Sequence, residues 1–304
     1  SGWVVGAGRV LRTDDGGTTF TDQSGGVGLP DGLLDVRAVT AADPARAVIV
    51  AEVERNDAPY EETEALLFTT DGGASWNVAA RASDLVPFVD RIDGEPCLTR
   101  TGQGIVSVDG NVFLTSDGGG SWTPGPRFEW FIGDQNSSGS GDGFESPLFL
   151  CSGESDLWIV VSGQDPRGDA LWHSPDGGAS WENLTTAVGR IPDYPSSASF
   201  VASGAGWLIN ASDTDTSLLR SEDRGATWSA LPSPLFSNDH GGPAELPEAM
   251  AFADERVGLM VLTGFGANGF ADRHPVLATT EGGVTWRRSE LPDGFQPLAL
   301  SFVP

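Results

Sequence analysis

The eight residues SPDGGASW, from Ser174 to Trp181, follow a pattern that occurs six times along the chain. Each copy opens on a hydroxyl residue, has an acidic residue and at least one glycine in the middle, and closes on an aromatic residue. Because repeats at a period of 46 to 59 residues set the architecture of a whole protein, we predict six similar structural units. The copies begin at Thr13, Thr69, Thr115, Ser174, Ser221 and Thr279.

The sequence around each copy predicts a β-hairpin. A short apolar segment such as EALLF (64–68), NVFL (111–114) or DALWH (169–173) precedes the copy, and a short mixed segment follows it. Glycine allows the positive φ angles that such turns need, and a carboxylate can accept hydrogen bonds from turn amides. The closing aromatic residue, which is Trp in five copies and Phe20 in the first, offers a large apolar surface to bury between neighbouring sheets.

These six copies resemble the Asp-box, also called the BNR repeat, of the β-propeller group that includes sialidases, photosystem II assembly factors and sortilin-like proteins. The resemblance implies an all-β, six-bladed propeller of four-stranded antiparallel blades, in which each box joins the third strand to the fourth. Glu281 replaces the Asp in the last copy and Phe20 replaces the Trp in the first. Neither change alters the predicted fold.

The two ends of the chain are predicted to share one blade. The last residues, SFVP (301–304), joined to the first, SGWVV (1–5), parallel the internal stretch SFVASGAGWLI (199–209). A C-terminal strand at about 297–303 would complete the first blade, close the ring and make residues 1–304 a single domain. The innermost strands are expected near 35–39, 95–100, 147–151, 198–202, 249–253 and 298–302.

The composition limits the partners of the chain. Its 304 residues include 43 acidic and 17 basic ones, every basic residue is arginine, and the formal net charge is −26. Such a field repels phosphate backbones and anionic headgroups, so no nucleic-acid partner is expected, whereas divalent cations and cationic partners are favoured. No apolar run of about 18 residues occurs, so no insertion of this chain into a membrane is expected.

The two cysteines, Cys97 and Cys151, fall near the start of two successive innermost strands. They form either one disulfide between blades, in an exported protein, or two buried thiols. A disulfide needs Cα atoms within about 7 Å. The chain begins at Ser1, which is compatible with a processed precursor. We expect an extracellular, periplasmic or cell-surface location, with a signal or anchor outside this chain.

The resemblance to sialidases raises the question of catalysis. In that family three arginines clamp the substrate carboxylate, a Tyr assisted by a Glu is the nucleophile, and an Asp is the acid and base. The only tyrosines, Tyr60 and Tyr194, lie in loop-like segments, and GRIP (189–192) has Gly where the family motif has an aromatic residue. In a sialidase Arg190 would be a clamp and Tyr194 or Tyr60 the nucleophile.

Other catalytic templates are not met. The histidines have no metal-ligand spacing, and His173 and His274 are interpreted as strand or turn residues, with His240 the third. Neither a GxSxG motif nor a phosphate-binding glycine loop before a helix occurs. The sequence therefore predicts no catalytic residue and no organic cofactor.

A polar insertion, DQNSSGSGDGFE (134–145), follows the calcium-loop template. Oxygen donors fall at template positions 1, 3, 5, 7, 9 and 12, with glycine at position 6. Only Gly141, at position 8, departs from the pattern, and a lone loop tolerates that change. The alternative is a Gly/Ser-rich surface loop that matches by composition. A bound Ca²⁺ would order the insertion and stabilise the propeller. The predicted ligands are Asp134, Asn136, Ser138, Ser140, Asp142 and Glu145.

The function predicted from these observations is a non-catalytic binding or scaffold propeller outside the cytoplasm. It would recognise a protein, peptide or glycan at the channel face, where the loops of a propeller form a rigid surface, and it could be a subunit of a larger assembly. This prediction rests on fold analogy and on missing catalytic parts. The alternative is a glycoside hydrolase of the sialidase type that acts at the same face.

Overall fold

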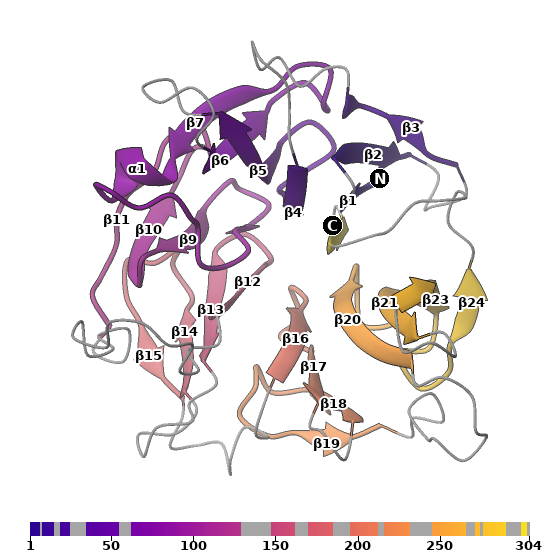
Figure 1. The fold of residues 1–304 in the computed structure, drawn as a ribbon. Coiled ribbons are helices and arrows are strands. Elements are labelled where there is room, and N and C mark those ends of the chain that lie inside the picture. The colour runs from indigo at the N-terminus through magenta and orange to yellow at the C-terminus, as the bar shows by residue number, and fades with distance from the viewer. Residues whose placement is uncertain are drawn as a thin grey trace.

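The computed structural model describes residues 1–6, 8–14, 19–24, 35–54, 62–128, 147–161, 170–184, 195–211, 216–231, 245–265, 271–273, 276–289 and 299–302. These residues form six antiparallel sheets around a central axis, which is a six-bladed β-propeller (Figure 1). The predicted fold is confirmed. One short helix, α1 (Ala82–Leu85), lies between the second and third blades, and no described helix has the length and hydrophobicity to cross a bilayer.

Each blade contains four strands in chain order from the axis outward, apart from the first blade, which begins with the C-terminal strand. Blade 1 consists of β25 (Ala299–Phe302), β1 (Gly2–Gly6), β2 (Arg9–Thr13) and β3 (Thr21–Asp22). Blade 2 consists of β4 (Asp35–Ala41), β5 (Ala47–Glu54), β6 (Glu62–Thr69) and β7 (Asn77–Arg81). Blade 3 consists of β8 (Cys97–Leu98), β9 (Gly104–Val108), β10 (Asn111–Thr115) and β11 (Thr123–Pro124).

The second half of the ring has the same plan. Blade 4 consists of β12 (Leu148–Ser152), β13 (Asp156–Val161), β14 (Ala170–Ser174) and β15 (Glu182–Asn183). Blade 5 consists of β16 (Pro195–Phe200), β17 (Gly206–Ala211), β18 (Thr216–Ser221) and β19 (Ser229–Ala230). Blade 6 consists of β20 (Glu245–Phe252), β21 (Gly258–Phe265), β23 (Val276–Thr279) and β24 (Arg287–Ser289), and β22 (Ala271–Arg273) pairs with β21.

The ring closes through its two ends, as the sequence predicted. β25 pairs antiparallel with β1, with Phe302 opposite Gly2 and Ala299 opposite Val5. The N- and C-terminal ends therefore lie close together in one sheet (Figure 1). Because β25 comes from the C-terminal end and β1 from the N-terminal end, this blade joins the two ends of the chain and closes the ring.

The repeated eight-residue segment, named the box turn from here on, joins the third strand of a blade to the fourth. In blade 2, Thr69 Oγ1 accepts a hydrogen bond from Gly73 N–H at 2.9 Å and donates one to Asp71 at 2.8 Å. Asp71 also accepts bonds from the Ser75 hydroxyl at 2.6 Å and the Ser75 N–H at 2.9 Å. These bonds, those of Ser75 foremost, lower the pKa of Asp71 to about 2.

The same bonds recur in the next three box turns, around Asp117, Asp176 and Asp223. In the last turn the longer Glu281 still accepts a bond from Thr285 Oγ1 at 2.7 Å. The acidic residue of each of these turns is therefore occupied in closing the turn, which is the role predicted for it.

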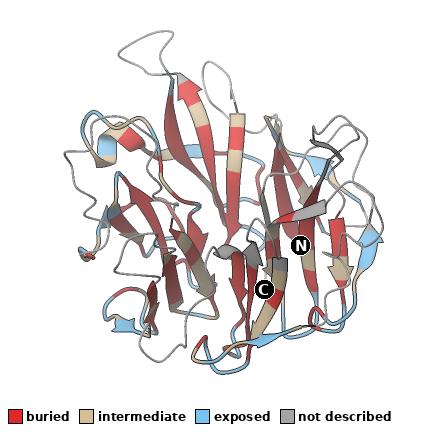
Figure 2. Cartoon of the chain, turned by 60° about the horizontal axis from the view of Figure 1, so that its bottom comes forward, coloured by how far each residue is buried: buried red, intermediate tan, exposed pale blue. Residues whose placement is uncertain are grey.

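The aromatic residue of the box turn packs between neighbouring blades. Trp207 of β17 stacks on Phe252 of β20 with ring centroids 3.7 Å apart, and Trp286 meets Phe252 edge-on at 6.1 Å. Trp286 Nε1 donates to the Gly283 carbonyl at 3.0 Å, which satisfies its polar atom. An equivalent triplet joins blades 4 and 5 through Trp158, Phe200 and Trp228. Figure 2 shows the outcome, with buried residues along the strands and exposed ones at the turns.

The second glycine of the box turn lies against the preceding blade. Gly119 has φ +91°, and a Cβ added there would lie 2.1 Å from Cγ2 of Val48 in β5. Gly73 repeats this arrangement, with φ +87° and 2.7 Å to the ring of Trp3 in β1. Glycine is required twice over here, because an L side chain disfavours this φ and the neighbouring blade leaves no room for it.

We therefore predict that Gly119→Ala lowers the free energy of unfolding by about 2–4 kcal/mol through backbone strain and overpacking. Gly120→Ala is the matched control, because its Cβ would meet nothing closer than 3.4 Å and three other box turns carry alanine at that position, namely Ala74, Ala179 and Ala226. The control should change stability by less than about 0.5 kcal/mol. Urea denaturation followed by tryptophan fluorescence measures both; equal losses would contradict the proposed contact.

The innermost strands are also linked directly across the blade interfaces. Cys97 of β8 and Cys151 of β12 form a disulfide with Cα atoms 5.5 Å apart, which decides between the two states open at the sequence level. Thr40 Oγ1 accepts a bond from Leu98 N–H at 3.0 Å, and Ser199 Oγ accepts one from Phe252 N–H at 3.0 Å. The disulfide joins residues that are 54 positions apart. In the chain-entropy model, this cross-link stabilises the folded state by about 4 kcal/mol, because it restricts the unfolded chain.

Candidate functional site

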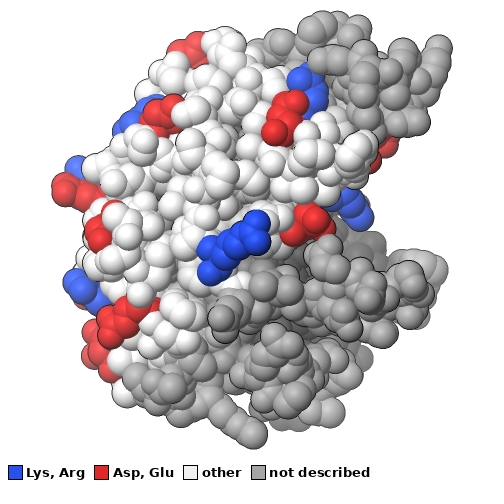
Figure 3. Space-filling view, turned by 90° about the vertical axis from the view of Figure 1, so that its left-hand side faces the viewer, with Lys and Arg blue, Asp and Glu red and all other residues white. Residues whose placement is uncertain are grey.

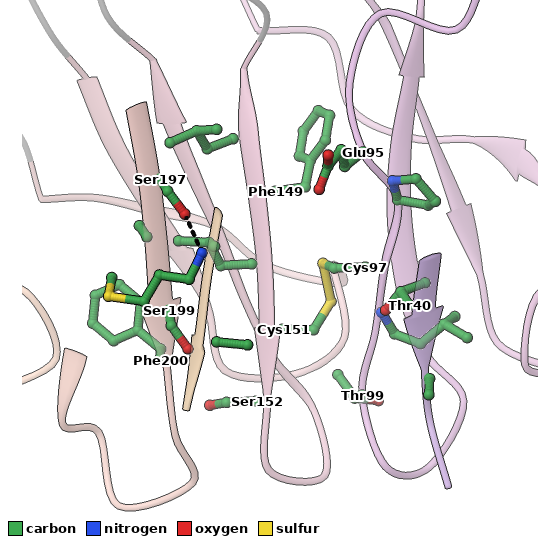
Figure 4. A pocket seen from close by; sticks show the side chains of 18 of the residues that line it. Thr40, Glu95, Cys97, Thr99, Phe149, Cys151, Ser152, Ser197, Ser199 and Phe200 are labelled. Carbon is green, nitrogen blue, oxygen red and sulfur yellow. Dashed lines mark hydrogen bonds between the residues drawn. A yellow bond between two sulfur atoms is a disulfide. The ribbon is translucent and has the colours of Figure 1, made fainter. Parts of the chain in front are cut away.

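The innermost strands enclose a cavity of about 430 Å³ along the axis of the ring. β4, β8, β12, β16 and β20 line it, together with the segment that leads into β8 (Figure 4). Met250 and Phe252 belong to the core between blades, so the alternating Ala249, Ala251 and Ala253 face the cavity. Small side chains on this wall leave room for a ligand.

The two ends of the cavity differ in chemistry. One end lies beside the box turns, since Gly118 N–H of a box turn donates to the Gly102 carbonyl just beyond Thr99 and Arg100. The opposite end, named the channel mouth, carries Arg37, Asp93 and Glu95. Figure 4 shows this separation, with Glu95 at one end of the cavity and Thr99 and Ser152 at the other.

Arg37 at the channel mouth is engaged with the protein. Its Nε and Nη2 donate to the two carboxylate oxygens of Glu64 at 2.8 and 3.0 Å, and Nη2 also donates to the Ile92 carbonyl. Glu64 is 8% exposed and accepts a further bond from Ile92 N–H at 2.6 Å. The fork of Arg37 is thus neutralised within the protein, which leaves it poorly suited to clamp the carboxylate of a ligand.

Two carboxylates at the channel mouth have no such partner. Asp93 accepts a hydrogen bond from Gly110 N–H at 2.6 Å, and burial raises its pKa. Glu95 points into the cavity beside Phe149 (Figure 4), and no described residue forms a hydrogen bond or ion pair with its side chain. Water reaches Glu95 through the cavity, but the protein surrounds it, and this desolvation raises its pKa to about 7 against the opposing charge of Arg37.

The segment before the channel mouth displays an aromatic residue. Phe88 is fully exposed and has φ +68°, a conformation that a bulky residue adopts only at a cost of about 1–2 kcal/mol. The backbone around it is held in place, because Val86 N–H donates to the Ala82 carbonyl and Glu64 N–H to the Asp90 carbonyl. β7 ends and β8 begins on this side of the ring, so Phe88 lies on the same face as the channel mouth.

The residues singled out from the sequence divide into two groups. The calcium loop at 134–145 lies outside the described residues, as do Tyr60, Arg190 and Tyr194 of the sialidase alternative and the histidines His240 and His274. His173 is described: it is buried in β14, bonds to Asp156 at 2.8 Å and stacks on Trp158, so it is the strand residue expected. Within the described ranges no three His, Cys, Asp or Glu side chains are placed to hold a metal.

Sequence reasoning did not single out Arg37, Asp93 or Glu95. The available signal was a charged residue within or directly before an apolar innermost strand, as in DVRAV (35–39) and EPCLTR (95–100). In a chain with 43 acidic residues this signal is weak, and only the closed ring shows which of them meet at the axis.

No family model and no curated protein matches the chain. Among solved structures, a chain of the nidogen/laminin complex has a TM-score of 0.62 at 9% identity over 100% of this chain and 98% of that one. YCF48 from Cyanidioschyzon merolae has a TM-score of 0.50 at 18% identity, over 94% of this chain and 80% of that one. The Hadza microbial sialidase Hz136 has a TM-score of 0.51 at 15% identity, over 84% of this chain and 57% of that one. At these identities the likeness shows the propeller fold alone.

The environment of Glu95 predicts a pH-dependent cost to stability. Folding raises the pKa of Glu95 from 4.5 to about 7. The protonated carboxyl therefore makes its full contribution to the free energy of unfolding below pH 4.5, and this contribution is lost as the pH rises through 7. Glu95→Gln should therefore raise Tm slightly at pH 8, because solvent at the exposed side chain screens the charge, and should leave Tm unchanged near pH 4.5. Differential scanning calorimetry across this range tests the prediction; a constant difference at all pH values would contradict it.

Proposed function

We propose that this chain is a non-catalytic Asp-box propeller that acts outside the cytoplasm and binds a segment of a protein or peptide at the channel mouth. The carrying observation is an axial cavity of about 430 Å³ whose mouth presents a carboxylate, Glu95, without a described partner. A carboxylate without a described partner at the opening of a cavity offers a counter-charge to a cationic group of a ligand.

Phe88 supports the same face as the binding surface. The positive φ and the full exposure of Phe88 do not stabilise the free protein. Aromatic side chains are frequent among the residues that contribute most to binding between proteins. The side of the ring seen in Figure 3, around blades 3 and 4, instead carries interspersed acidic and basic groups among its described residues. Because both signs of charge are mixed on that side, it distinguishes a cationic from an anionic partner less well than the channel mouth does.

The extracytoplasmic location is supported by the disulfide between Cys97 and Cys151. Such bonds form and persist in oxidising compartments. A protein or peptide fits this face better than a glycan, because a carboxylate at the cavity and a protruding aromatic ring lie on the same face. A sialidase would need free guanidinium groups at this position, and Arg37 is already paired with Glu64.

Binding at the cavity predicts sensitivity to a substitution that fills it. Linear peptides selected from a displayed random library on the purified protein should bind Ala251→Phe at least tenfold more weakly than the wild type, because the new ring occupies the space that Ala251 leaves open. Ala179→Phe, on an exposed box turn at the opposite face, should leave the dissociation constant unchanged. Isothermal titration calorimetry measures both, with thermal melts to confirm folding.

Two results would contradict the proposed function. One is equal affinity of the selected peptides for both phenylalanine variants. The other is hydrolysis of a fluorogenic sialoside that disappears in Arg190→Ala, since that outcome would identify GRIP (189–192) as a substrate clamp and favour the glycoside hydrolase alternative.

We further propose that the loop at 134–145 binds a structural Ca²⁺ through the six ligands named above. The support is the match to the template in an anionic chain. Calcium at 100 times its dissociation constant should then stabilise the fold by about 2.7 kcal/mol, and a chelator should remove this gain. Melting curves of Glu145→Ala should show no response to calcium, whereas Asp213→Ala, in the acidic stretch SDTDTS (212–217) outside the loop, should respond like the wild type. A calcium response retained in Glu145→Ala would refute the site.

A further inference from the structure

We propose that the channel mouth takes a basic side chain, Lys or Arg, from the bound segment, with its cationic end against Glu95. This inference rests on the proposed binding function and names the chemistry that the mouth selects. It makes Glu95 the specificity-determining residue of the cavity.

The charge expected on the ligand follows from which charged side chains at the channel mouth are already paired within the protein. Four ionisable side chains line the described cavity, namely Arg37, Asp93, Glu95 and Arg100. Arg37 is paired with Glu64, and Arg100 directly follows Thr99, which lies at the opposite end, beyond the disulfide (Figure 4). Asp93 and Glu95 therefore leave the mouth with uncompensated negative charge, which attracts a cation and repels a carboxylate.

The surroundings of Glu95 favour a long side chain over a bare ion. Pro96, Pro147 and Phe149 form an apolar wall next to it, and Gly94 packs so closely that a Cβ there would lie 3.0 Å from the Phe149 ring. A Lys or Arg stem can cover such a wall while its charged end reaches the carboxylate. A bare metal ion would need several ligands, and the described residues hold no group of three that could provide them.

Binding of a cation should be linked to the release of a proton. Desolvation by the protein atoms around the cavity raises the pKa of Glu95 to about 7, so part of the molecules carry a protonated Glu95 at neutral pH. A positive charge beside it favours the ionised form, so the affinity for a basic side chain should rise between pH 6 and pH 8. Among the described residues, the other charged side chains that line this end of the cavity are Arg37, on β4, and Asp93, on the segment that carries Glu95.

The test uses synthetic peptides acetyl-GSGXGSG-amide in which X is arginine, its neutral isostere citrulline, or glutamate. Titration calorimetry at pH 8 should show at least about tenfold tighter binding of the arginine peptide than of the citrulline peptide, as expected for one charge-assisted contact. Glu95→Gln should bring this ratio close to one. Glu154→Gln, which makes the same charge change on an exposed residue at the opposite end of the ring, should keep it.

The pH dependence separates a direct contact from a structural effect. The arginine peptide should bind the wild type and Glu154→Gln more weakly at pH 6 than at pH 8, while Glu95→Gln should show no such change. A purely structural role of Glu95 would weaken all three peptides alike and would overturn the inference, as would equal binding of arginine and citrulline peptides.

Failure of this inference can be told apart from failure of the proposed function. Peptides selected from the library that are lost in Ala251→Phe but indifferent to Glu95→Gln would leave the binding function standing and overturn the basic-side-chain inference. Selected peptides indifferent to both substitutions would overturn both. Absence of measurable binding of the arginine peptide at millimolar concentration would also overturn the inference.

Discussion

The contact between each box turn and the blade before it is the constraint on which the structure depends. A propeller blade is a twisted sheet that cannot bury both of its faces alone, so each must be covered by a neighbour. In this chain the closing Trp and the second glycine of the turn make that contact at the periphery, as Trp76 with Trp3 and Gly119 with Val48 illustrate. The hydroxyl and acidic residues of the turn maintain its conformation through hydrogen bonds within the turn.

A second set of links holds the ring at its axis. The disulfide of Cys97 and Cys151 and the bonds accepted by Thr40 and Ser199 connect successive innermost strands. The described blades are therefore fixed both at the periphery and at the centre. The channel-mouth face carries the positive φ of the exposed Phe88 and the carboxylate of Glu95 that has no described partner.

The environment of the charges separates structure from function at this site. Arg37 and Glu64 satisfy one another in a bidentate pair that also ties down Ile92, so they hold the segment leading into β8. Glu95 belongs to the same segment, yet it has no described partner and faces the cavity. An ion pair thus fixes the segment, and the same segment displays a carboxylate that has no described partner.

The sequence by itself determined the fold of this protein, because the information that sets a propeller is local and repeated. Each box turn specifies its own hairpin through residues within eight positions, and the paired ends, 1–5 and 301–304, matched an internal stretch closely enough to predict ring closure. The innermost strands could be placed for the same reason. The cysteines could be assigned to neighbouring strands, but not to a disulfide, because the distance between their Cα atoms depends on how two blades pack.

Only the tertiary structure decided which polar residues meet at the axis. Arg37, Glu64 and Glu95 lie on three different segments, and nothing local distinguishes Glu95 from the other acidic residues of the chain. Whether a carboxylate is paired or free, and whether it is solvated or enclosed, depends on atoms that come from several blades. The physical reason is that backbone turns are set by neighbours in sequence, whereas the electrostatics of a channel is set by neighbours in space.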